Sequence, residues 1–122
     1  MSKGKQITLR LEVTDEFCDD IISIAEEGGI NYWAESLNFN GDHRWTESEA
    51  SSEKAPRKTF ELTHDLIRFG LRKVLGDYIM ELNSQLRSEI FQAVSENDAG
   101  NVDVSGADVI VQAAVFSEIV YG

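Results

Sequence analysis

The sequence predicts an α+β fold in which a small antiparallel sheet of three or four strands packs against an acidic amphipathic helix and a C-terminal helical layer. If residues 15–27 form a helix, their apolar side chains fall on one face and their acidic side chains on the other. Short segments before residue 63 are aromatic or alternate between apolar and polar side chains, as strands do. Beyond residue 63, apolar positions recur at helical spacing. Residues 1–122 are expected to form one globular domain, with residues 1–6 flexible.

The expected strands are bounded by turn and loop signals. They are residues 7–13, 30–39, 43–47 and 59–62. Asn40-Gly41-Asp42 is a turn signal between the second and third. Residues 48–58 hold the only proline and few apolar side chains, which is typical of an exposed loop.

Capping residues mark the expected helices. Thr14 or Asp15 begins the acidic helix, and Gly28-Gly29 ends it. Thr63 begins a helical pattern that runs to Val94, within which a glycine permits but does not force a bend. The segment from Ser105 is apolar around nearly its whole circumference. Such a helix is buried, either at the centre of the fold or under a second copy of the chain as a homo-oligomer interface.

Six carboxylates occupy one face of the helix at 15–27. They are Asp15, Glu16, Asp19, Asp20, Glu26 and Glu27. Like charges one turn apart, and negative charges in the last turn, both cost helix stability. The face repels nucleic acid and attracts basic surfaces, so it is either a solvated helix face or the contact surface for a basic partner.

Three aromatic side chains flank the predicted hairpin turn. If the strands alternate, Tyr32 and Trp33 face opposite sides, so that one ring enters the core and the other is partly exposed. An exposed ring, here or at Trp45, would suit a protein-binding contact beside the acids. Core packing is the alternative.

A basic stretch follows the acidic one. Arg57, Arg68 and Arg72 offer a second interpretation, a pocket for a small anionic ligand that also uses Tyr32 and Trp33. Pairing of these arginines with the acidic residues is the other interpretation. A net charge of −11 and the small local basic surplus argue against direct nucleic-acid binding.

No motif predicts catalysis, a cofactor or a metal centre. His43 and His64 lie in different segments, without zinc-ligand spacing. No serine stands in a nucleophile elbow, and the apolar neighbours of Cys18 predict a buried thiol. The lack of a catalytic motif predicts a protein that is not an enzyme. A lone cysteine, without a recognisable signal peptide or membrane span, predicts a reducing cytoplasm as its location.

Two segments carry a family resemblance. Gly28-Gly-Ile-Asn-Tyr-Trp-Ala34, and Ala107-Asp-Val-Ile-Val-Gln-Ala-Ala-Val-Phe-Ser-Glu-Ile-Val-Tyr-Gly122, resemble a family of small acidic bacteriophage and prophage proteins. Leu62-Thr63 before a helix with Phe69-Gly70 fits the same pattern, whereas the family often has glycine in place of Ser117. The resemblance implies a phage origin and supplies no catalytic residues.

Together these observations predict a phage accessory protein that binds and blocks a host factor. The natural target is a nucleic-acid-binding defence protein, as for anti-CRISPR or anti-restriction inhibitors, with the carboxylates occupying sites meant for phosphates. The alternatives are a small-ligand-binding or sequestering protein and a homo-oligomeric structural accessory protein.

Overall fold

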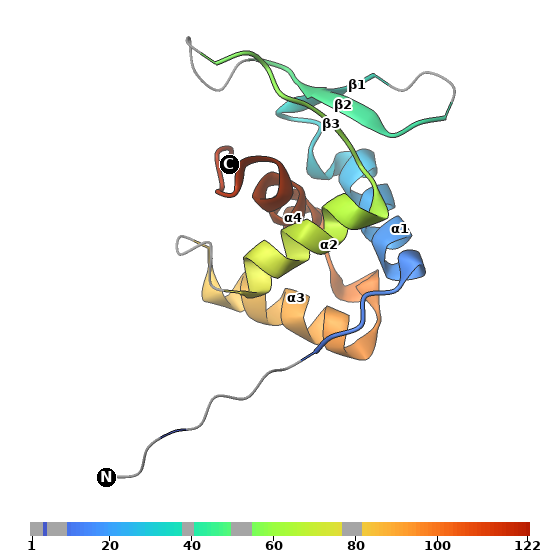
Figure 1. Ribbon diagram of the computed structural model, residues 1–122, viewed down its shortest axis with the longest axis vertical. Helices are drawn as coiled ribbons and strands as arrows, with labels where there is room; N and C mark the ends of the chain where they lie inside the picture. Colours follow the sequence, from blue (N-terminus) through green and yellow to red (C-terminus); the bar gives the residue numbers. More distant parts are fainter. Residues whose placement is uncertain (1–3, 5–9, 38–40, 50–54, 77–81) are drawn as a thin grey trace.

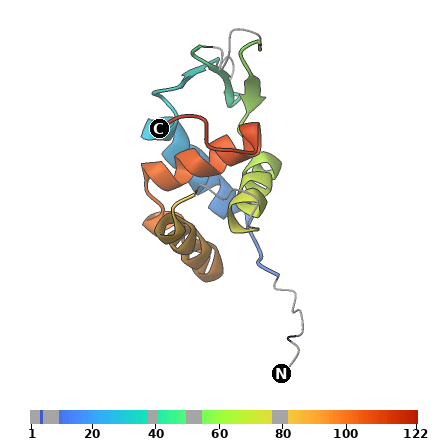
Figure 2. The ribbon, with the colours of Figure 1, turned by 90° about the vertical axis from the view of Figure 1, so that its left-hand side faces the viewer.

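The predicted α+β class is confirmed. The computed structural model describes residues 4, 10–37, 41–49, 55–76 and 82–122. In this part of the chain, four α-helices form a layer, and a three-stranded antiparallel sheet of order β1-β2-β3 covers one end of it (Figure 1). The helix α3 lies at the opposite end of the layer from the sheet (Figures 1 and 2).

The acidic helix begins where the sequence predicts, but its α-helical part ends before the expected Gly28-Gly29 cap. Helix α1 spans Asp15–Ile24 and continues as a π-helical turn, η1, over Ala25–Gly29. Thr14 is the N-cap residue, since its Oγ1 accepts a hydrogen bond from the Phe17 amide at 3.1 Å. The strand expected before it is not seen in residues 10–13, and residues 7–9 lie outside the described part.

The sheet is smaller than predicted. Its strands are β1 (Ala34–Ser36), β2 (Arg44–Glu47) and β3 (Thr59–Glu61). Residues 30–33 form a turn instead of extending β1, because the Trp33 and Ala34 amides both donate to the Ile30 carbonyl. Trp45 pairs with Phe60 in the antiparallel register, which places both rings on the core side. The predicted turn at 40–42 and loop at 48–58 are described only in part.

The helical pattern after Thr63 divides into two helices. Helix α2 spans His64–Leu75 and is capped by the Thr63 hydroxyl, which accepts from the Leu66 amide at 3.0 Å. Helix α3 spans Ser84–Glu96 and has its own cap, Asn83. A left-handed Asn97 ends α3, and a short 3₁₀ turn, η2 (Ala99–Asn101), leads to the last helix.

Helix α4 (Val104–Phe116) lies at the centre of the fold. Its N-cap is Asp103 instead of the expected Ser105, and it packs against α2, η1 and α1 (Figure 2). At the crossing with α2, an added Cβ at Gly70 would lie 2.2 Å from the Ile110 carbonyl oxygen, so only glycine permits this approach. The apolar C-terminal helix is therefore buried by its own chain, which removes the reason to expect a second copy over it.

Candidate functional site

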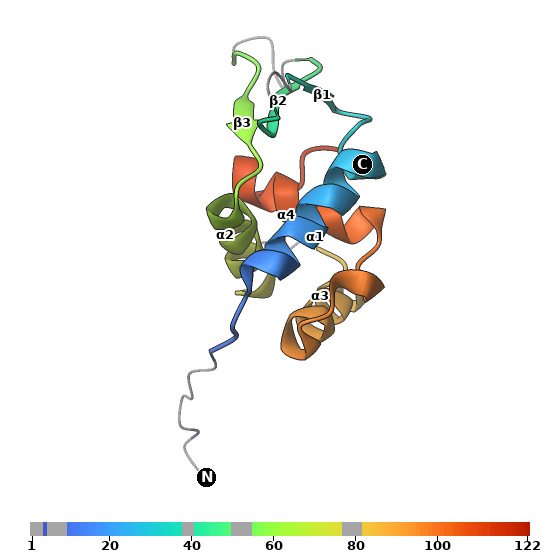
Figure 3. The same cartoon turned by 90° about the vertical axis from the view of Figure 1, so that its right-hand side faces the viewer.

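The acidic face of α1 remains largely open to solvent. Figure 3 shows α1 on the outside of the molecule, in front of α4. Five of the six predicted carboxylates are exposed and one, Glu26, is partly buried. The exposed ones are Asp15, Glu16, Asp19, Asp20 and Glu27. The face is thus accessible to a partner over its whole length.

Two of these carboxylates contact basic side chains of helix α2. Arg68 Nη2 lies 2.6 Å from Asp15 Oδ1, and His64 Nε2 lies 2.7 Å from Asp19 Oδ1. The hydrogen bond from Arg68, with the nearby His64, holds the pKa of Asp15 below its ordinary value. No base lies on α1 itself, but the fold brings two from α2, which partly relieves the repulsion expected from the sequence.

The sixth carboxylate, Glu26, makes its contacts within the protein. Its two carboxylate oxygens accept hydrogen bonds from Trp45 Nε1 at 2.9 Å and pair with His43 Nδ1 at 2.8 Å. These contacts tie η1 to strand β2. Glu16, Asp20 and Glu27, in contrast, form no ion pair within the described part of the chain. They are the acids that remain for a partner.

The aromatic residues divide between core and surface. Trp33 and Trp45 are only 2% and 5% exposed, so they leave the predicted contact set. Tyr32 is 57% exposed. One ring is buried and the other exposed, as predicted, although both residues lie in the turn before β1 and not in an alternating strand. The Trp33 ring stacks on Tyr121 at a centroid distance of 5.2 Å. Of the three, Tyr32 alone is available to a partner.

A buried polar network behind Tyr32 was not predicted. Asp108, on α4, is only 8% exposed. It accepts hydrogen bonds from the Tyr32 hydroxyl at 2.6 Å, Trp33 Nε1 at 2.8 Å and Gln112 Nε2 at 2.9 Å. Burial, with the Asp108 carboxylate beside it, raises the pKa of Tyr32. The signal in the sequence was a polar pair four residues apart in an otherwise apolar helix, which places both side chains on one face.

Gln112 also holds the C-terminal segment onto the fold. Its Oε1 accepts from the backbone amides of Val120 and Tyr121, both at 2.9 Å. Its Nε2 donates to the Tyr121 carbonyl at 3.1 Å. The Tyr121 hydroxyl then donates to Glu47, a fully buried carboxylate of β2. Burial and this carboxylate raise the pKa of Tyr121 to about 12. The network links α4, the sheet and the segment after α4.

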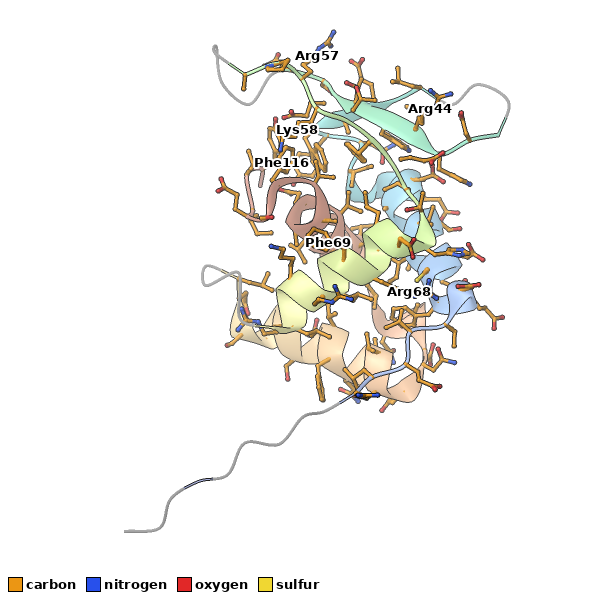
Figure 4. The ribbon with its side chains drawn as sticks, viewed as in Figure 1. Arg44, Arg57, Lys58, Arg68, Phe69 and Phe116 are labelled. Carbon is orange, nitrogen blue, oxygen red and sulfur yellow. The ribbon has the colours of Figure 1, made fainter. Side chains whose placement is uncertain are left out.

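The three arginines of the alternative interpretation do not converge. Figure 4 shows Arg57 near the sheet, far from Arg68 on α2. Arg68 and Arg72 do line one cavity of about 450 Å³, together with apolar side chains that include Leu71 and Phe91. Arg68 is already engaged, because it donates to the Val13 carbonyl as well as to Asp15. Tyr32 and Trp33 are not among the lining residues.

Comparison with known proteins assigns no function to the acidic face or to the cavities. No protein-family model, curated protein or solved structure matches the chain significantly. The phage resemblance therefore stays a prediction, and the function has to be argued from the chain's own residues.

Nowhere among the described residues do three or more His, Cys, Asp or Glu side chains gather to hold a metal ion. Cys18 is buried as predicted, and burial raises the pKa of its thiol, which disfavours the reactive thiolate. None of the described helices has the length and apolar character needed to cross a membrane.

Proposed function

We propose that the protein binds a partner with a basic surface through the exposed face of α1, and thereby blocks nucleic-acid binding by that partner. As the sequence predicts, the partner is a defence factor of a bacterial host, and the protein is a phage inhibitor of the anti-CRISPR or anti-restriction type that acts in the host cytoplasm. The observation that carries the proposal is the set of exposed, unpaired carboxylates Glu16, Asp20 and Glu27.

The spacing of these groups supports a contact with several cations at once. Glu16 and Asp20 lie one helical turn apart, about 6 Å along the axis, and Glu27 follows in the π-helical turn η1. Rows of like charge on an open helix face raise the rate of association with an oppositely charged surface, and the gain falls as salt is added. A partner that evolved to hold phosphates presents the matching arginines and lysines.

The test compares two variants with equal loss of charge. Glu16→Gln/Asp20→Asn removes two carboxylates from α1, whereas Glu89→Gln/Glu96→Gln removes two exposed carboxylates from α3. Asp15, Asp19 and Glu26 are left intact, because their internal contacts would confuse loss of binding with loss of stability.

Each variant and the wild type is used to capture proteins from a bacterial lysate rich in defence systems, with elution by a salt step and identification by mass spectrometry. We expect the wild type and the α3 variant to retain a nucleic-acid-binding protein that moderate salt releases and whose nucleic acid competes with capture. The α1 variant should lose it. Equal capture by all three would contradict the proposal.

The cavity beside Arg68 and Arg72 favours the small-anion alternative. Because Arg68 also holds Val13 and Asp15, Arg72→Ala is the cleaner probe of that cavity. A rise in melting temperature with a nucleotide, abolished by Arg72→Ala, would support ligand binding. A melting temperature that nucleotides leave unchanged would count against it.

A further inference from the structure

A second cavity lies where η1, the start of α4 and the C-terminal segment meet. Its volume is about 400 Å³, within the range of small-ligand pockets. Gly28 and Gly29 line it together with the side chains of Tyr32, Ser105 and Asp108. A cavity of this size therefore has a carboxylate and an aromatic ring in its wall.

The charge of this cavity is not balanced from within. All three donors to Asp108 are uncharged: a phenol hydroxyl, an indole and an amide. No ion pair of the described residues includes Asp108, and none of the described lining residues is basic. Hydrogen bonds satisfy the oxygens of a buried carboxylate, but removing its negative charge from water still costs free energy unless a cation lies nearby.

The lining selects the chemical class of ligand. A carboxylate with an exposed Tyr32 ring at its side favours an organic cation, which gains from both the charge and the ring face. The other cavity, with Arg68 and Arg72, has the opposite character. A guanidinium suits the present one best, because it is planar, weakly hydrated and stacks on aromatic rings.

The cavity lies at the end of the helix that carries the acidic face. Gly28 directly follows Glu26 and Glu27, the last acids of that face, and Figure 3 shows the C-terminus beside the same end of the helix. A partner steered onto the carboxylates of α1 would thus reach the cavity with an adjacent side chain. We propose that this cavity takes an arginine side chain of the basic partner, anchored by Asp108 and Tyr32, an inference that rests on the proposed function.

The two tryptophans allow a direct test. Trp33 donates its indole N–H to Asp108, and Trp45 donates its own to Glu26, on the outer face. Their indole signals in a ¹H–¹⁵N spectrum therefore report on the cavity and on the acidic surface separately. The probe is N-acetyl-L-arginine methylamide at millimolar concentration, and the norleucine analogue is the matched uncharged control.

We expect the arginine probe to shift the Trp33 signal saturably, to leave Trp45 nearly unmoved, and to outperform the norleucine analogue. Asp108→Asn should weaken the effect at least tenfold. Should that variant fail to fold, Ser105→Lys is the substitute: Ser105 is exposed, and an ammonium group placed there competes for Asp108. The inference is overturned if Trp45 alone shifts, if neither signal shifts, or if norleucine acts equally.

This titration needs no partner and leaves the α1 carboxylates in place. A missing Trp33 shift overturns the cavity assignment while the α1 proposal stands. Capture that is insensitive to the α1 substitutions overturns the proposed function, and it does so without altering the titration.

Discussion

The substitution Gln112→Glu tests the buried network with an almost isosteric change. The new side chain keeps an oxygen for the Val120 and Tyr121 amides, but it replaces the amide that donates to Asp108 Oδ1 at 2.9 Å. If both carboxylates were ionised, their repulsion at this distance would be about 6 kcal/mol even at an effective dielectric constant of 20. The folded protein avoids this cost by binding a proton, which restores the donor.

The proton sets the size and the sign of the effect. The introduced carboxylate has an unfolded pKa of about 4.3, and in the folded state its pKa is raised. The free energy of unfolding of the variant therefore falls below that of the wild type only above about pH 4.3, by about 1.4 kcal/mol per pH unit. The expected loss relative to wild type is about 1 kcal/mol at pH 5 and about 3.7 kcal/mol at pH 7.

Urea denaturation followed by circular dichroism, at pH 5 and at pH 7, measures both values. The control is Gln92→Glu on the exposed surface of α3, where the change meets Glu96 one turn away and should cost a few tenths of a kcal/mol at either pH. Equal losses for Gln112→Glu at the two pH values would refute the assignment of Gln112 as a donor to a buried charge.

Two further changes probe helix packing and the ion pairs of α1. Gly70→Ala should destabilise the fold by about 2 kcal/mol or more, because its Cβ would meet the Ile110 carbonyl oxygen at 2.2 Å. Gly28→Ala should be tolerated, because the nearest atom to its Cβ belongs to a side chain and lies 3.6 Å away. Thermal unfolding of the two variants compares their stabilities. Asp15→Asn should lower stability at pH 7, and the difference from wild type should close as the pH falls below about 3.9, since the Arg68 contact lowers the folded pKa of Asp15. An unchanged difference in urea denaturation at pH 3 would contradict this.

The local elements were predictable because their signals are local. Capping residues and period marked α1 and the start of α2, and the turn signal at residues 40–42 marked the return of the chain as β2. The strand that alternation predicted before α1 is not seen in residues 10–13. The division between α2 and α3 was missed because the apolar period continues across it, although Asn83 could have been identified as a cap. The length of β1 was missed because the turn after η1 depends on backbone hydrogen bonds to Ile30, which no side-chain pattern records.

The candidate site was predictable only where it lies on one element. The exposed acids of α1 follow from helical period, whereas their partners Arg68 and His64 come from α2 and depend on the helix packing. The pairing of Tyr32 with Asp108 joins residues that are 76 positions apart. Such contacts follow from the tertiary fold, which single-sequence patterns do not determine.

The π-helical turn η1 connects the two parts of the proposed binding surface. This turn continues directly from α1, and its acids Glu26 and Glu27 are followed at once by Gly28 and Gly29. Both glycines line the cavity beside α4. At Gly29, an added Cβ would lie 3.1 Å from the Val104 carbonyl, so a larger residue would press on the start of α4. The backbone amide of Asp108, whose side chain accepts from Tyr32, would lie 3.6 Å from the same Cβ. The end of the acidic row and the glycines of the cavity therefore belong to one element, and a larger residue at Gly29 should alter the cavity while leaving the carboxylates of α1 exposed.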